Sequence, residues 1–264
     1  MDPSTSTSAS AVAKPTLAII QGSFQTPLFY QAFHSQLQSQ GFETVHPELP
    51  SCNPSAPDHP SKTLTDDARA VHAVLTRLVE EESKPVVVIM HSYGGLVGSE
   101  AIPQSLTYTS RKAEGKAGGV LHLFYCAAFI LPVGQSVLSA FGESPNNELY
   151  GNGTFKMKNA KDVLFGDLPE PEADMWASRM VPQSYGVQET KLSQAAWEYV
   201  ASTYLVCEGD KAVPRAYQEG FAETAGSRVL VSDDGVGHEA MLSWTAGLVD
   251  VVLGVLRKLE GETV

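Results

Sequence analysis

Short, continuous apolar segments rich in β-branched residues recur along this chain. They cover residues 16–20, 42–45, 85–90, 119–128, 202–207 and 228–231. Such segments are typical of strands that are buried on both faces of a parallel sheet. Apolar positions at helical spacing occupy several intervening segments, among them residues 28–40, 64–81 and 240–259. This alternation predicts an α/β fold with a doubly wound, mostly parallel sheet.

The strand pattern stops between Leu131 and Tyr199, where polar turns alternate with helical pieces. An excursion of this length inside one domain is usually functional. We therefore expect a helical cap at residues 132–199, inserted into a core that consists of residues 15–131 and 200–264. Residues 1–14, rich in Ser, Thr and Ala, predict a disordered tail.

A serine follows the most apolar predicted strand directly. Residues 86–95 read VVVIMHSYGG, which places Ser92 in a sharp turn before two glycines where a helix begins. This context exposes a serine hydroxyl as a nucleophile. The pattern departs from G-x-S-x-G because Met90 occupies the first small position. We interpret Ser92 as the nucleophile.

A serine nucleophile needs a base and an acid that orients the base. His238 follows the last predicted strand in the segment GVGHEAM, and Asp210 follows the preceding strand in CEGDKAVP. The chain order Ser92, Asp210, His238 differs from the orders in chymotrypsin and subtilisin and agrees with that of α/β-hydrolases. We predict a triad of these three residues.

Other acids and histidines remain as alternatives. The acids are Glu208, Asp233 and Asp234, which we otherwise expect to be solvated loop residues. His46 ends a predicted strand and is a weak competitor for the base. His91 adjoins the nucleophile, but its side chain should point away from it, which favours a structural role.

An oxyanion hole needs two backbone N–H groups near the nucleophile. One comes from the residue after the serine, and the other comes from the loop after the first strand. These are the amides of Tyr93 and of Ser23, which lies in the segment QGSF at residues 21–24.

The cap carries bulky side chains that could line an apolar pocket, although large apolar residues more often pack a core. They include Leu149, Phe155 and Phe165. Our candidates for the pocket, from the core and the cap together, are Phe24, Phe129, Phe141, Trp176, Met180 and Trp197.

Composition limits the partners and the location. A net charge of −12 argues against nucleic acid, because binding a phosphate backbone needs a basic face. No segment has the length of a membrane span or of the apolar part of a secretory signal. Three widely spaced cysteines offer neither a metal-ligand pattern nor an even disulfide set. We expect a soluble cytoplasmic protein that binds a small molecule and no metal; a homodimer stays open.

From Thr16 to Leu259 the order of these segments resembles the α/β-hydrolase fold-1 family, particularly its branch of plant methyl-ester esterases and hydroxynitrile lyases. The segments that carry the resemblance are QGSF, HSYGG, YLVCEGDKAVP and GVGHEAM. The resemblance implies an α/β-hydrolase fold and an acyl-enzyme reaction without a cofactor.

Three functions compete. The first is hydrolysis of a small carboxylic ester or lactone, and the second is a lyase or cyclase in which Ser92 and His238 transfer protons. The third is a non-catalytic binding protein on the same scaffold. A cap without lysine near the triad would favour hydrolysis, and the cap contains Lys156, Lys158 and Lys161.

Overall fold

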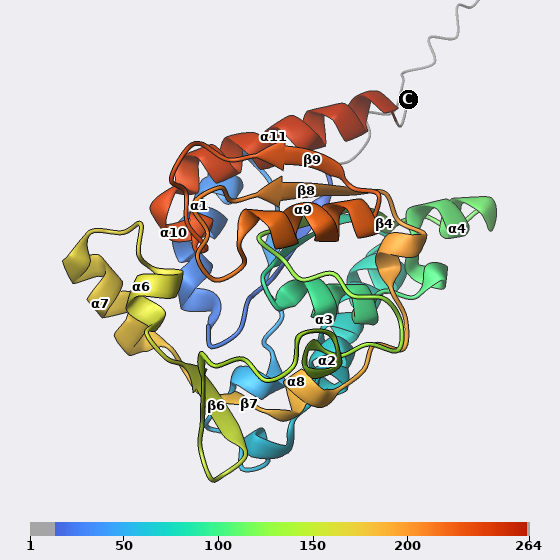
Figure 1. Ribbon diagram of the computed structural model, residues 1–264. Coiled ribbons are helices and arrows are strands. Elements are labelled where there is room, and N and C mark those ends of the chain that lie inside the picture. The colour runs from blue at the N-terminus through green and yellow to red at the C-terminus, as the bar shows by residue number, and fades with distance from the viewer. Residues whose placement is uncertain (1–13, 263–264) are drawn as a thin grey trace, which may run out of the picture.

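The computed structural model describes residues 14–262. Within them, six parallel strands form the central sheet in the order β2-β1-β3-β4-β8-β9 (Figure 1). These strands are β1 (Thr16–Ile20), β2 (Thr44–Val45), β3 (Pro85–His91), β4 (Gly119–Cys126), β8 (Ser202–Val206) and β9 (Arg228–Val231). The apolar strands β1, β3, β4 and β8 are buried, because they lie inside the sheet with helices around them. Strand β9, at the edge, is largely exposed. The predicted fold class is confirmed.

Helices cover both faces of the sheet (Figure 1). The helices α1 (Gln31–Ser39) and α11 (Thr245–Glu262) pack together on one face, and α2 (Leu64–Thr76) packs with α3 (Gly94–Ala101) on the other. The remaining core helices are α4 (Tyr108–Ala113), α9 (Arg215–Thr224) and α10 (Ala240–Ser243). Short turns of 3-10 helix are Pro27–Tyr30, Pro50–Cys52, His59–Ser61, Gln104–Leu106 and Ala196–Glu198, and Arg77–Glu81 is a π-helical turn.

The strand order places the start of a binding site. After β1 the chain goes outward to β2 and then returns to the other side of β1 as β3. Ligands of open α/β sheets bind at such a reversal, beyond the carboxyl ends of the strands. The turns after β1 and β3, which contain Ser23 and Ser92, meet there.

Residues 132–199 contain helices and also a small sheet that the sequence did not predict. Its helices are α5 (Val137–Phe141), α6 (Ala160–Leu164), α7 (Glu170–Arg179) and α8 (Gly186–Glu189). The antiparallel strands are β5 (Asn147–Leu149), β6 (Thr154–Met157) and β7 (Gln183–Ser184). The polar sequence GNGT is the turn between β5 and β6, while β7 is too short to leave a pattern.

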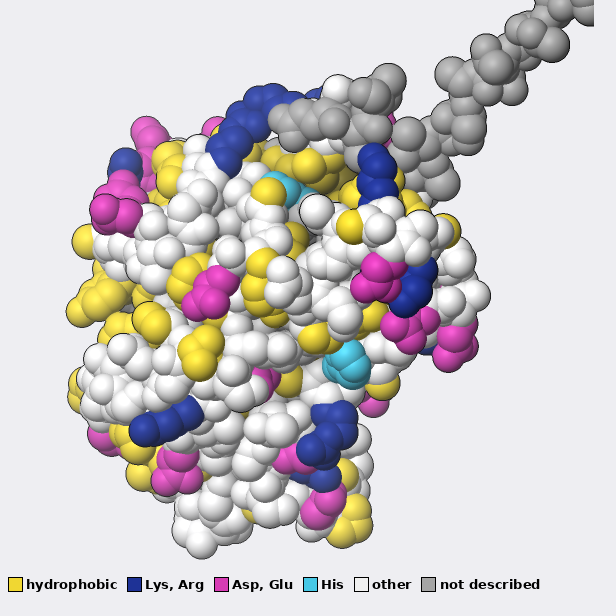
Figure 2. All heavy atoms as spheres, turned by 90° about the vertical axis from the view of Figure 1, so that its right-hand side faces the viewer, with side chains coloured by type: hydrophobic (Ala, Val, Ile, Leu, Met, Phe, Trp, Pro, Cys, Tyr) yellow, Lys and Arg dark blue, Asp and Glu magenta, His cyan; other side chains and the backbone are white. Residues whose placement is uncertain are grey.

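Two expectations concern the ends of the chain and its environment. The predicted disordered tail lies outside the described residues except for Lys14. None of the helices in residues 14–262 has the length and hydropathy needed to cross a membrane. On the face in Figure 2, basic side chains lie among acidic ones.

The first glycine of α3 makes a testable contribution to the fold. A Cβ atom at Gly94 would lie 2.5 Å from the carbonyl oxygen of Ile20 and 2.7 Å from that of Gln21, so the helix could no longer approach β1. We expect Gly94→Ala to lower the free energy of unfolding by about 2 kcal/mol or more, as overpacking does. Gly220→Ala in the exposed part of α9 meets nothing within 4 Å and serves as the control. Chemical denaturation of both variants measures the difference, and equal midpoints would contradict this account.

Candidate active site

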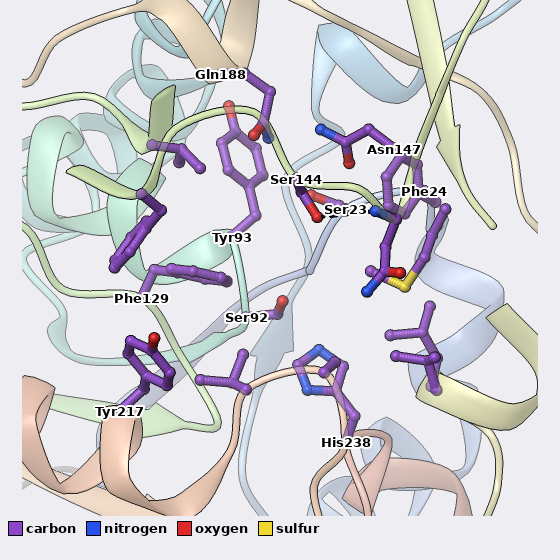
Figure 3. Close-up of a pocket in the computed structure, with 18 of the residues that line it drawn as sticks. Ser23, Phe24, Ser92, Tyr93, Phe129, Ser144, Asn147, Gln188, Tyr217 and His238 are labelled. Carbon is purple, nitrogen blue, oxygen red and sulfur yellow. Dashed lines mark hydrogen bonds between the residues drawn. The ribbon is translucent and has the colours of Figure 1, made fainter. Parts of the chain in front are cut away.

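Ser92 lies in a strained turn between β3 and α3. Its φ angle is 52°, in the left-handed region that residues other than glycine seldom adopt. The amide of Ser92 donates to the carbonyl oxygen of Cys126 at 3.3 Å, and the Ser92 carbonyl accepts from the amide of Phe129 at 3.0 Å. These bonds tie the turn to the end of β4 and direct the Ser92 side chain into a cavity (Figure 3). A buried strand, a strained turn that contains the serine and a helix follow one another here, as a nucleophile elbow requires.

Met90, the departure from G-x-S-x-G, is accommodated by a glycine in the following helix. The Met90 side chain is fully buried and occupies the space where Gly98 would carry a Cβ atom. The bulk that most elbows avoid before the serine is therefore packed into α3 rather than into the turn.

The structure brings the predicted acid and base together. His238 Nδ1 lies 2.8 Å from Asp210 Oδ2, and both side chains are almost completely buried. The amides of Ala212 and Val213 donate to the other oxygen of Asp210 at 2.8 and 2.9 Å, which fixes the carboxylate. Because a carboxylate accepts, Nδ1 carries the proton in neutral His238, and Nε2 presents a lone pair.

The alternative acids and histidines lie elsewhere. Glu208 forms an ion pair with Arg215, and Asp233 accepts from the indole of Trp244 at 2.9 Å. Asp234 is exposed. The ring nitrogens of His46 contact His34 and Gln21.

The charge of Asp210 makes His238 a stronger base than a free imidazole. Burial alone would lower the pKa of His238, but the Asp210 carboxylate raises it through its charge and its hydrogen bond, to about 9. A base of this strength is suited to take a proton from a hydroxyl group.

Ser23, in the turn after β1, and Tyr93, next to Ser92, carry the two amides that were predicted to form an oxyanion hole. Ser23 and Tyr93 both line the cavity. Within residues 14–262 the structure assigns neither amide a hydrogen-bond acceptor. An amide without a protein acceptor can donate to an oxygen of a bound molecule, as an oxyanion hole requires.

The cavity has a volume of about 330 Å³ and two apolar walls (Figure 3). Phe129 and Tyr217 lie on one side of Ser92, and Phe24 lies on the other. Polar side chains of Ser144, Asn147 and Gln188 line the part farthest from His238. Further apolar lining comes from Leu96, Val137, Phe141, Phe155, Met157 and Phe221.

Three of the expected pocket residues do not line this cavity. Trp176 packs on Phe29 with ring centroids 4.9 Å apart, and Met180 is buried in the hydrophobic core. Trp197 packs against the core beside α3. These three side chains pack the cap against the core, whereas Phe24, Phe129 and Phe141 line the cavity.

Two buried carboxylates near the triad, those of Asp67 and Glu239, were not predicted from the sequence. Asp67 accepts from the hydroxyl of Tyr93 at 2.8 Å, and burial raises the pKa of Asp67 to about 6. It lies on the apolar face of α2, between Leu64 and Val71, and an acid at such a position is a signal that could have been used. Glu239 is fully buried beside His238, and nothing in the segment GHEA distinguishes it from a surface acid.

One cluster has the composition of a metal site. Ligand atoms of His91, His238 and Glu239 lie within 4.8 Å of one another. However, both ring nitrogens of His91 and both carboxylate oxygens of Glu239 already have protein hydrogen-bond partners. The cluster is therefore a hydrogen-bonded network, and His91 has the structural role that its sequence position suggested.

Comparisons of sequence find related proteins along most of the chain. The chain matches the model of the alpha/beta hydrolase family over residues 19–251. Alpha/beta hydrolase nvfD of Aspergillus novofumigatus is 29% identical over 257 residues, which cover 95% of this chain and 98% of that protein. Probable hydrolase R7 of a Phoma species is 28% identical over 254 residues, which cover 91% and 98%.

Solved structures share the fold at low sequence identity. Tomato methylketone synthase I, complexed with 2-tridecanone, has a TM-score of 0.74 at 14% identity and covers 94% of this chain and 99% of its own. Polyneuridine aldehyde esterase has a TM-score of 0.71 at 17% identity and covers 91% and 99%. At these identities the likeness concerns the fold.

Proposed function

Because this chain belongs to the alpha/beta hydrolase family, we propose that it hydrolyses a small, uncharged carboxylic ester or lactone with Ser92 as the nucleophile. One observation carries the proposal: Ser92, on a strained turn, shares the base of a cavity with His238, and a buried carboxylate holds His238 Nδ1 at 2.8 Å. The two unpaired amides at Ser23 and Tyr93 support it.

The reaction proceeds in two halves. His238 Nε2 takes the Ser92 hydroxyl proton as Oγ attacks the ester carbon, and the amides of Ser23 and Tyr93 stabilise the oxyanion. The protonated His238 then donates to the leaving oxygen as its bond to carbon breaks, which leaves an acyl group on Ser92. A water molecule, deprotonated by His238, releases the acid and restores the serine.

The shape of the cavity describes the substrate class. Its apolar walls on either side of Ser92 suit aliphatic or aromatic groups on both the acyl and the alcohol side. The amides of Asn147 and Gln188 suit hydroxyl or carbonyl oxygens. The carboxylate of Glu143, which lines the cavity, disfavours an anionic substrate.

The lysines of the cap favour hydrolysis over the lyase alternative. Lys156 donates to the carbonyl oxygen of Met180 at 2.9 Å, and Lys158 donates to that of Pro145 at 3.1 Å. Lys161 forms ion pairs with Glu170 and Asp174. Among the described residues that line the cavity there is no lysine that could assist a lyase reaction.

A fluorophosphonate probe tests the proposal directly. We expect the probe to form an adduct on Ser92, located by peptide mass spectrometry, because only an activated serine reacts with it. His238→Ala removes the base and should abolish labelling. Folded wild-type protein that remains unlabelled would shift the assignment to a lyase, a cyclase or a binding protein.

A further inference from the structure

Glu239 links the segment of His238, the base of the proposed triad, to the N-terminal loop that contains Gln25. Its two carboxylate oxygens each lie 2.6 Å from Gln25 Nε2, and both side chains are buried. A hydrogen bond to a carboxylate in dry surroundings is short and strong. The segment that follows His238 is therefore fixed to the loop that follows β1.

Gln25 in turn fixes the backbone around Ser23. Its Oε1 accepts from the amide of Gly22 at 3.2 Å and from the hydroxyl of Tyr30. Between these anchors, Phe24 has a φ angle of 65°, which a bulky side chain adopts only when its surroundings enforce it. The Ser23 amide lies within this strained turn, so its direction depends on the contacts of Gln25.

Tyr30 and His91 close the network onto the base. The Tyr30 hydroxyl lies 2.8 Å from His91 Nδ1, and His91 Nε2 lies 2.9 Å from the carbonyl oxygen of His238. Because a carbonyl only accepts, His91 Nε2 carries a hydrogen, and Nδ1 of neutral His91 has a lone pair. The single hydrogen of the Tyr30 hydroxyl can be donated either to this nitrogen or to Gln25 Oε1. The loop with Ser23, the turn with Ser92 and the segment with His238 thus share one set of buried hydrogen bonds.

We propose that Glu239 is a positioning residue that acts through Gln25 to direct the Ser23 amide into the oxyanion hole. This inference rests on the proposed ester hydrolysis and adds to it a residue outside the triad. Glu239 lines the base of the cavity, but both of its oxygens are already bound by Gln25, so its effect on the substrate is exerted through that side chain.

The charge on Glu239 changes near neutral pH. Burial raises the pKa of Glu239 to about 7, while His238 and the hydrogen bond from Gln25 oppose this rise. Asp210 and Asp167 raise it further, and the other titratable neighbours are His91 and Tyr30. Above this pKa the ionised carboxylate accepts from Gln25; below it, one oxygen carries a proton and the contact weakens.

The test is Glu239→Gln, which keeps the size of the side chain and removes its charge. With p-nitrophenyl butyrate we expect kcat to fall about 10- to 100-fold and KM to change by less than about 3-fold, since loss of a whole oxyanion donor costs roughly 10² to 10³. The rate of fluorophosphonate labelling at Ser92 should fall in parallel.

The pH profile distinguishes positioning from a general loss of structure. In the wild type, log(kcat/KM) should fall with a slope of about 1 as pH drops below the pKa of His238, and with a slope of about 2 below that of Glu239. In Glu239→Gln the slope should stay near 1, because one of the two ionisations is gone.

The exchange Gln25→Glu with Glu239→Gln is the rescue control. It restores a buried pair of one carboxylate and one amide, and we expect kcat within about 5-fold of the wild type, because the pair rather than its direction holds the loop. Should the single variant fail to fold, as judged by circular dichroism, the exchange variant decides.

Three outcomes overturn the inference. The first is a folded Glu239→Gln variant with wild-type kcat and an unchanged pH profile. The second is a folded exchange variant whose kcat is lower than that of the wild type by about ten-fold or more. In both cases wild-type hydrolysis and labelling at Ser92 leave the proposed function intact. Wild-type protein that neither labels nor hydrolyses esters overturns the proposed function and the inference together.

Discussion

Ser92→Ala should abolish ester hydrolysis while the protein stays folded. Loss of the nucleophile from a serine triad lowers turnover by roughly 10⁵- to 10⁶-fold. The rest of the cavity should still bind the substrate. Alanine at this position keeps the left-handed backbone with φ of 52°, so the melting temperature should change little. Steady-state hydrolysis of p-nitrophenyl butyrate and thermal unfolding measure the two effects.

Ser23→Ala is the matched control for this variant. Ser23 also lines the cavity, but its proposed contribution is the backbone amide, which alanine retains. We expect its kcat/KM to stay within about 3-fold of the wild type. Ester turnover that persists in Ser92→Ala, or that is lost equally in Ser23→Ala, would refute the assignment of the nucleophile.

The parts of the site that the sequence predicted are those with local signals. Ser92 follows a buried strand and precedes two glycines, and this pattern identifies a turn without knowledge of the rest of the fold. Asp210 and His238 each follow a strand of the same parallel sheet. Because the carboxyl ends of parallel strands lie at one edge, their order along the chain predicted that they meet.

The parts that the sequence missed depend on contacts between distant segments. Glu239 and Gln25 are 214 positions apart, and no pattern around either residue indicates the other. The sheet of the cap depends on the pairing of the two-residue strand β7 with β6, which leaves no periodicity. Trp176 and Met180 are large apolar residues of the kind that line pockets. Only the packing of the cap decides which of its sides faces the cavity.

Two buried acids outside the triad therefore each hold one segment of the site in place. Asp67 holds the side chain of Tyr93, and Glu239 holds Gln25 in the loop of Ser23. The two amides proposed for the oxyanion hole belong to these two segments. The fold thus fixes the position of each donor from behind, before a substrate arrives.

Asp210→Asn should slow hydrolysis and also move its dependence on pH. An asparagine at this position no longer selects the His238 tautomer with a proton on Nδ1, and such a change lowers turnover by about 10³- to 10⁴-fold. The carboxylate also raises the pKa of His238 to about 9, so its removal lowers that pKa. Because His238 works as a base only when it is unprotonated, the rise of kcat/KM with pH should begin at a lower pH in the variant.

The ratio of kcat/KM for the wild type to kcat/KM for Asp210→Asn should consequently vary with pH. Above a pH of about 9 wild-type His238 is unprotonated and the wild type has its full advantage. As the pH falls, the wild type loses its free base first, and the gap between the two narrows. Glu208→Gln removes a half-buried acid from the same turn and should leave the profile unchanged. If kcat/KM of Asp210→Asn rises over the same pH range as that of the wild type, the rise reports the ionisation of a group other than His238.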